Sequence, residues 1–304
     1  MIENRKQILL IHGHHVKPPL EQLESIWVDA LRWGLNRDFP DKTGDFENAD
    51  WHMAYYGDLS NQFLADKKAY DPQLDVADRL HAFEQLKTFN KRKKFNRADY
   101  QRLPGKTALK EMLADVGSPL LGKLGLEIPT IARLAPELCE YWDAGSAYSV
   151  AVRDRVRSVI SRALANDSET LILAHCMGAV ISYDILWELS QASAEKKVNM
   201  LVTMGCPLGN TTIQKKLAGS AEKGSKRFPA NVLAWRNLSA EDDYVCHDKT
   251  IADDFRAMLK HRMISSIKDY RIYNMSVRYG KSNPHSSIGY LIHPRVAKIL
   301  SDWL

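Results

Sequence analysis

A cysteine lies where an apolar segment typical of a buried strand runs directly into one typical of a helix. The order around this junction is Ala174-His175-Cys176-Met177-Gly178. A strand-to-helix turn without a loop brings the flanking backbones together, so the residues two before and two after its centre must be small. The turn also lifts the central side chain above the sheet edge at a helix N-terminus, where free N–H groups favour an anion. The pattern predicts a nucleophilic thiol at Cys176.

This junction resembles the nucleophile elbow of the α/β-hydrolase superfamily, within its lipase- and esterase-like branches. Members carry Gly-x-Ser-x-Gly or Ala-x-Ser-x-Gly at the turn, whereas this chain has Cys176 where serine is usual. Three explanations stay open: a native cysteine nucleophile, a serine enzyme in which cysteine was introduced, and an inactive relative. A buried structural cysteine is the alternative that involves no chemistry.

The resemblance implies where the catalytic acid should lie. In this family the nucleophile comes first along the chain, the acid second and the histidine last. The acid is therefore expected after the predicted strand 232–238, where the segment 238–245 resembles the Asp-Pro-Val type of loop. Aligning Asp-x-Val selects Asp243, with the neighbouring Asp242 as the alternative. The alternative interpretation of this segment is an acidic turn exposed to solvent, without a catalytic role.

The same resemblance implies the catalytic histidine. It is expected in the loop 280–287, after the predicted strand 270–277, and His285 is the only histidine of that loop. His293 precedes a proline and is interpreted as the start of the final helix. His247 and His261 come before the last strand and fit the expected order less well.

An oxyanion hole is also implied, formed by two backbone N–H groups that stabilise the negative oxygen of acyl transfer. One is expected from Met177, directly after the nucleophile. The other is expected from His14, because Ile11-His12-Gly13-His14-His15 matches the family's strand followed by His-Gly. A metal bound by His12, His14 and His15 is the alternative, although no carboxylate with matching spacing is visible.

Two further residues are expected to line the substrate pocket. His175 lies inside the elbow, where a histidine more often packs than reacts. Cys206 belongs to Gly205-Cys206-Pro207-Leu208-Gly209, which resembles the turn after the following strand in lipase-like proteins. An ordinary tight turn explains that segment equally well. The chemistry implied by these residues requires no cofactor and no metal.

The elements that would position these residues alternate between strands and helices, which predicts an α/β fold with a mostly parallel sheet covered by helices on both faces. Strands are expected at 7–11, 51–56, 170–174, 198–204, 232–238 and 270–277, and helices near 20–35, 150–164, 177–190 and 294–304. The α/β-hydrolase core is expected to comprise 1–59 and 148–304.

The segment 60–147 lacks a clear strand and is predicted to be a helical cap or lid insertion over the core, with helical patches at 74–83 and 109–116. It contains a basic run, Lys91, Arg92, Lys93 and Lys94. A solvated helical face is the simplest interpretation of this run. A peripheral contact with an anionic membrane or a partner protein is the alternative, and nucleic acid is not expected.

The composition is that of an ordinary globular protein: 304 residues, 45% hydrophobic, 26% charged, with a net charge of +5. No apolar run approaches the roughly 18 residues of a membrane span, and a cytoplasmic location is expected. The sequence thus predicts a hydrolase that cleaves a carboxylic ester, of a lipid or another small acyl compound, through a covalent acyl-enzyme. A thioesterase, an acyltransferase and an inactive pseudo-hydrolase that binds a ligand are the alternatives.

Overall fold

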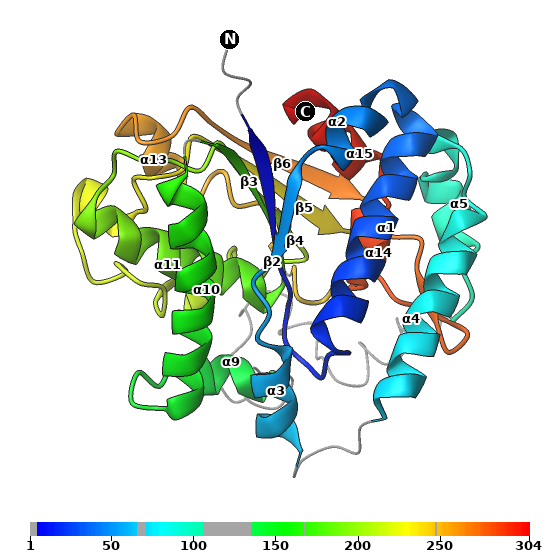
Figure 1. Cartoon of the computed structure of the whole chain (residues 1–304), viewed down its shortest axis with the longest axis horizontal. Coiled ribbons are helices and arrows are strands. Elements are labelled where there is room, and N and C mark those ends of the chain that lie inside the picture. Colours follow the sequence, from blue (N-terminus) through cyan, green and yellow to red (C-terminus); the bar gives the residue numbers. More distant parts are fainter. Residues whose placement is uncertain (1–4, 66–70, 106–134, 167, 247) are drawn as a thin grey trace.

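A computed structural model describes residues 5–65, 71–105, 135–166, 168–246 and 248–304. Its centre is a six-stranded sheet in which every neighbouring pair is parallel, in the order β2-β1-β3-β4-β5-β6 (Figure 1). The predicted α/β class is confirmed. The strands are β1 Lys6–Ile11, β2 Asp50–Met53, β3 Glu169–His175, β4 Met200–Met204, β5 Ala234–Ala240 and β6 Ser266–Ile272.

Both faces of the sheet are buried, as the unbroken apolar runs of its central strands require. Alternate residues of a strand point to opposite faces. Ile8 and Leu10 of β1 belong to one hydrophobic cluster, and Leu9 and Ile11 belong to the other. The chain therefore has two cores separated by one sheet.

Helices cover each core. One core is closed by α10 and α11, with α3 and α9 beside them, and the other by α1, α4, α14 and α15 (Figure 1). The bounds of these helices are α1 Leu20–Asp38, α3 Gly57–Leu64, α4 Pro72–Lys87, α9 Pro136–Tyr141, α10 Ala147–Ala165, α11 Met177–Ala192, α14 Ser287–Leu291 and α15 Pro294–Trp303. Smaller elements are α2 Thr43–Glu47, α5 Arg97–Gln101, α12 Thr211–Gln214, α13 Arg256–Lys260, the antiparallel pair β7 Val277–Arg278 and β8 Lys281–Ser282, and 3₁₀ helices at Pro40–Lys42, Arg92–Lys94 and Gly224–Arg227.

Two predicted strands end several residues earlier in the structure than the sequence predicts. The strand expected at 270–277 is β6, which begins earlier and leaves the sheet after Ile272. The chain turns there because Asn274 Nδ2 donates to the carbonyls of Pro284 and Ser286, at 2.9 Å each. The strand expected at 51–56 ends at Met53, and the Tyr56 N–H donates to His12 Nε2 at 3.1 Å instead of continuing the ladder.

The described part of segment 60–147 packs closely on the core. Phe83 and Leu86 of α4 belong to the same cluster as α1 and α15. Tyr100 is buried, and its hydroxyl donates to the Glu241 carbonyl at 2.8 Å. The helical patch expected at 109–116 lies outside the described residues. The division into core and cap stays a prediction.

The basic run Lys91–Lys94 lies on the surface between α4 and α5, and all four side chains are exposed. Its aromatic neighbours Phe89 and Phe95 contact each other, with ring centroids 5.9 Å apart, and pack against the core. Within the described residues, no helix has both the length and the apolar character needed to cross a membrane. Binding of the run to an anionic surface stays a prediction.

The turn from β3 into α11 has no free space around its glycine. A β-carbon added to Gly178 would lie 2.4 Å from the His12 carbonyl oxygen and 2.6 Å from the Ile11 carbonyl oxygen. Both are main-chain atoms at the end of the central strand β1, so they cannot move aside cheaply. The small residue that the sequence pattern requires is thus explained by contact between two segments far apart in the chain.

We expect Gly178→Ala to lower the free energy of unfolding by about 3 kcal/mol, because the added methyl group overpacks a rigid site. Gly44→Ala is the matched control, since a β-carbon at this helical glycine meets nothing within 4 Å. That substitution should be neutral or stabilise by about 0.5–1 kcal/mol. Urea denaturation of both variants measures the difference, and equal stabilities would contradict this account of the turn.

Candidate active site

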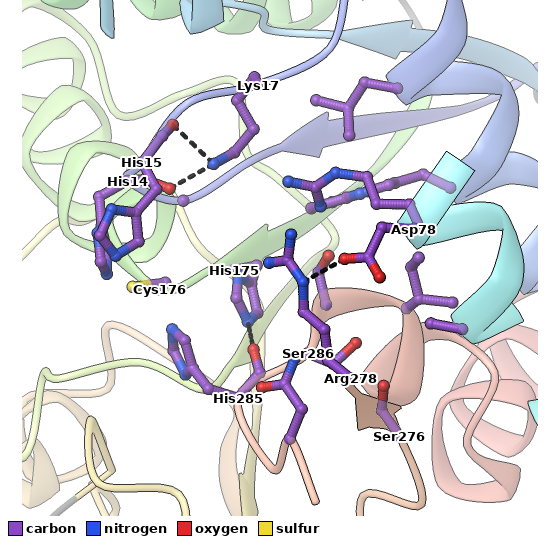
Figure 2. Close-up of a pocket in the computed structure, with 18 of the residues that line it drawn as sticks. His14, His15, Lys17, Asp78, His175, Cys176, Ser276, Arg278, His285 and Ser286 are labelled. Atoms are coloured by element: carbon purple, nitrogen blue, oxygen red, sulfur yellow. Dashed lines mark hydrogen bonds and ion pairs between the residues drawn. The ribbon is translucent and has the colours of Figure 1, made fainter. Parts of the chain in front are cut away.

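Cys176 occupies the turn that the sequence predicts for a nucleophile. β3 ends at His175, α11 begins at Met177, and Cys176 between them has φ 55° and ψ −123°. A positive φ is strained for a residue with a β-carbon and is found at such turns. The side chain is 3% exposed, but it lines a cavity of about 400 Å³ (Figure 2). The thiol is therefore held rigidly and can be reached from that cavity.

His285 lies between Cys176 and a buried carboxylate. Its Nδ1 is 3.0 Å from both oxygens of Asp243, and a ring nitrogen of His285 lies within 4.8 Å of the Cys176 sulfur. Because Nδ1 is occupied by the carboxylate, Nε2 is the nitrogen that faces the thiol. Three segments more than forty residues apart thus form a row of thiol, imidazole and carboxylate.

Asp243, and not Asp242, is the carboxylate that the structure joins to His285. Asp243 Oδ2 accepts from the Tyr290 hydroxyl at 2.7 Å, and Oδ1 accepts from the Val245 N–H at 3.0 Å. Asp242 instead accepts from the Tyr100 hydroxyl at 3.2 Å. The pairing of Asp243 with His285 follows from the turn after β5. Asp242 has φ 61° in this turn, and the next residue, Asp243, has its carboxylate in the interior.

The charge on His285 is favoured by its partners. Burial alone opposes a charged imidazole, but the Asp243 carboxylate and Cys176 outweigh it and raise the pKa of His285 well above its usual value. The opposite holds for His175, where burial and the neighbouring His285 lower the pKa. His285 is therefore the imidazole that can hold a proton beside the thiol.

The loop after β1 lies directly against Cys176. A β-carbon on Gly13 would be 2.7 Å from the Cys176 β-carbon, so only glycine allows this approach. His14 follows Gly13 directly in this loop, and Met177 is the first residue of α11, where N–H groups have no partner within the helix. The two residues expected to form an oxyanion hole lie on either side of Cys176.

A buried lysine shapes this loop. Lys17 Nζ donates to the carbonyls of His14, His15 and Val16, which are its own near neighbours. Burial lowers the pKa of Lys17 to about 7, against the opposing effect of the Glu137 carboxylate. The ammonium thus acts as a positioning group for the backbone at His14.

His12 fits a structural role better than a metal-binding one. Its Nε2 accepts from the Tyr56 N–H, its Nδ1 lies 2.9 Å from the Gly13 carbonyl, and its ring stacks on Tyr56 at 3.9 Å. Burial lowers its pKa well below the usual value. With both nitrogens engaged, His12 cannot join His14 and His15 in the metal site considered from the sequence.

Two other sets of donor atoms could hold an ion. Ligand atoms of His14, Cys176 and His285 lie within 4.8 Å of one another, and so do those of His14, His15 and Glu137. Nitrogen and sulfur donors suit zinc. An ion on the first set would occupy the thiol and imidazole that acyl transfer requires, so metal binding there and acyl transfer exclude each other.

The remaining histidines named from the sequence lie elsewhere or beside the site. His175 lines the cavity, and its Nε2 lies 3.1 Å from the His285 carbonyl, so it supports the catalytic loop. His293 caps α15 through its Nδ1, which accepts from the Arg295 N–H at 3.0 Å, as expected for a helix start. His261 ends α13 and is exposed, and His247 lies outside the described residues.

Cys206 does not line the cavity, contrary to the expectation from the turn sequence. It is 2% exposed, and its thiol donates to Asn237 Oδ1 at 3.3 Å. The part of that turn nearest the site is Gly205, which has φ 55°. A β-carbon there would lie 3.1 Å from Asp243 Oδ2 and from His175 Nε2. The turn therefore packs against Asp243 and His175 through Gly205, and the Cys206 side chain does not line the cavity.

Several residues of the site were missed from the sequence. Tyr290 had no assigned role, although its hydroxyl donates to Asp243. Lys17 follows the His-Gly segment closely, which is the one local signal that could have indicated it. Arg79 and Arg278 line the same cavity from α4 and β7. No local pattern could join them, because they are about 200 residues apart.

Comparison with known proteins adds no relative to this description. No protein-family model, no curated protein and no solved structure matches the chain. The resemblance to α/β-hydrolases therefore rests on the residues of the site and their arrangement.

We expect iodoacetamide to label Cys176 at least about ten times faster than the other three cysteines, because His285 stabilises the reactive thiolate. Burial raises the pKa of Cys206 to about 12 and also raises the pKa of Cys139 and Cys246. Peptide mapping after labelling at pH 8 measures the four rates, and His285→Ala should slow only the reaction of Cys176. Urea-unfolded protein should label at all four positions alike. Equal rates in the folded protein would refute an activated thiol.

The carboxylate assignment is tested by Asp243→Asn against Asp242→Asn. The first should lower turnover of an activated ester by about 10³-fold or more, because the imidazole loses the partner that orients it and stabilises its charge. The second is the matched control, because asparagine also adopts a positive φ, and it should change turnover less than about threefold. NMR titration should show a lower pKa for His285 in Asp243→Asn only. A larger loss in Asp242→Asn would reverse the assignment.

Proposed function

We propose that the protein is a carboxylic ester hydrolase of the α/β-hydrolase type, which acts through a covalent acyl-enzyme on Cys176. The observation that carries this proposal is the position of His285, with Nδ1 on the Asp243 carboxylate and a ring nitrogen within 4.8 Å of the Cys176 sulfur. A thiol, an imidazole and a carboxylate in this order are the parts that nucleophilic acyl transfer requires.

The proposed reaction has two halves. In the first, the Cys176 thiolate attacks the ester carbonyl, a C–S bond forms, and the N–H groups of His14 and Met177 stabilise the oxyanion. The C–O bond then breaks, and the leaving alkoxide takes the proton from His285. In the second half, His285 removes a proton from water, and the hydroxide attacks the thioester carbonyl. The C–S bond then breaks, which releases a carboxylic acid and regenerates the Cys176 thiolate beside protonated His285.

The same site would serve a thioesterase, since the leaving group alone differs, or an acyltransferase, in which another acceptor replaces water. An inactive binding protein is less well supported, because such a protein needs neither a buried acid on His285 nor a thiol at a strained turn. Peripheral contact through Lys91–Lys94 is a separate proposal, since none of these residues lines the cavity.

Intact-protein mass spectrometry after incubation with activated acyl esters tests the acyl-enzyme. We expect a mass increase of one acyl group on the wild-type protein, which disappears in Cys176→Ala and persists in Cys139→Ser, a cysteine outside the cavity. An ester that neither adds mass nor is turned over, on a protein whose Cys176 still reacts with iodoacetamide, would favour the binding protein instead.

Cys176→Ser distinguishes the explanations for the cysteine. Turnover of the ester should rise if the site is built for an alkoxide and cysteine was introduced. It should fall if the protein is a native thiol enzyme. The acyl-enzyme of the serine variant is an ester, so its mass adduct should be retained in either case if deacylation is the slower step.

A further inference from the structure

The cavity beside Cys176 has a second wall that carries two arginines. Arg79 of α4 and Arg278 of β7 both line it, together with Lys17 from the loop after β1. We propose that this wall is an anion subsite, which binds a carboxylate or phosphate group of the ester substrate at a distance from the scissile carbonyl. This inference rests on the proposed ester hydrolysis and names the class of substrate for it.

The two guanidinium groups are held together by a shared carboxylate. Asp75 Oδ2 accepts from Arg79 Nε at 2.7 Å, and Asp75 Oδ1 accepts from Arg278 at 3.3 Å. Asp78 accepts from Arg278 Nε (Figure 2). Asp75 is 8% exposed and is not part of the cavity lining. The carboxylates thus fix both arginines in place, which reduces the entropy lost when they bind a ligand.

Donors remain for a ligand after these contacts are made. Neither terminal nitrogen of Arg79 donates to a described residue, since its hydrogen bond to Asp75 uses Nε. Nη1 of Arg278 is likewise without an acceptor among the described residues. Planar guanidinium groups with unused N–H groups match the oxygens of carboxylate and phosphate.

A buried hydroxyl at the same wall supports a polar ligand independently. Ser276 lines the cavity, is 0% exposed, and its Oγ has no hydrogen-bond partner among the described residues. A buried hydroxyl without a partner is costly, and an oxygen of a bound anion would accept its proton. Ser276 lies two residues before Arg278, so both donors come from one short segment.

The cationic side chains of the lining outnumber its carboxylates, as an anion subsite requires. Among the described lining residues, the cationic side chains are Lys17, Arg79, Arg278 and protonated His285, and the carboxylate is Asp78. The apolar side chains of the described lining include Leu23 and Trp27 of α1 and Ala82 of α4, and they lie beside these charged groups. A long acyl chain would desolvate the arginines without offering them a partner, so a small charged substrate suits the described cavity better than a lipid chain.

A matched pair of substrates tests the subsite in the wild-type protein. The mono-p-nitrophenyl ester of adipic acid carries a free carboxylate, and p-nitrophenyl methyl adipate has the same chain without the charge. We expect kcat/KM for the acid to exceed that for the methyl ester by at least about tenfold, mainly through a lower KM, because the subsite binds ground state and transition state alike. A phosphonate of the same length separates the sources: a preference for it over the carboxylate assigns phosphate.

Variants locate the effect. Arg79→Gln and Arg278→Gln should each remove most of the preference for the charged ester, measured as the ratio of kcat/KM for the two esters. Arg102→Gln is the matched control, because Arg102 is 80% exposed and lies outside the lining, and it should keep the full preference. Arg278→Lys keeps the charge without the planar fork and should recover part of the preference, which guards against a loss caused by misfolding.

The two proposals fail in different ways. Turnover of both adipate esters at equal kcat/KM, or an equal loss of preference in Arg102→Gln, overturns the anion subsite and leaves the ester hydrolase intact. Turnover of neither ester overturns the hydrolase. The subsite is then tested by the rate at which iodoacetamide labels Cys176. Adipate should slow this labelling, and the uncharged adipamide should not. Equal protection by the two compounds overturns the subsite.

Discussion

Two backbone segments meet at Cys176 with no room for an additional β-carbon, and the geometry of the site depends on this contact. Gly13 of the loop after β1 approaches the Cys176 β-carbon, and Gly178 approaches the carbonyls at the end of β1. The Cys176 thiol, the proposed nucleophile, is consequently packed against the loop whose N–H group would hold the oxyanion. In the proposed reaction, close packing of the main chain, which tolerates almost no displacement, would set the distance between the attacking atom and the oxyanion hole.

Asp243 and His285 are held together by contacts with residues of the segments after β5 and β6. Asn274 binds the carbonyls on both sides of His285, and its own side chain leaves no space at Gly289, where a β-carbon would lie 1.8 Å from Oδ1. Tyr290, the next residue, accepts from the Ala240 N–H at 2.8 Å and donates to Asp243. The end of β5, the end of β6 and α14 are thus joined through polar side chains, so the imidazole and its carboxylate cannot move independently of the sheet.

The local signals in the sequence were sufficient for the elements and residues that depend on neighbours in the chain. The apolar runs of β1 and β3 and the small residues around Cys176 are such signals, and the turn at Cys176 is where it was expected. The resemblance selected Asp243 but left Asp242 as an alternative, because the contacts that distinguish the two come from Tyr100 and Tyr290 in distant segments. The end of β6 was misjudged for the same reason, since Asn274 acts through contacts with the loop around His285. Cys206 was misplaced because a turn sequence indicates a bend and not the direction of its side chains.

Burial and charge together explain why one imidazole of the site differs from the rest. His12, His14 and His175 are all buried, and burial lowers the pKa of each well below its usual value. His285 is buried as well, yet its pKa is raised, because a carboxylate lies within hydrogen-bond distance of its ring. A second charged imidazole in the same volume would repel the first, and the effect of His285 on His14 and His175 has that sign. The positive charge of these four imidazoles is thereby placed on His285, the ring that would return a proton to the leaving group in the proposed reaction, while the neutral rings lie around it.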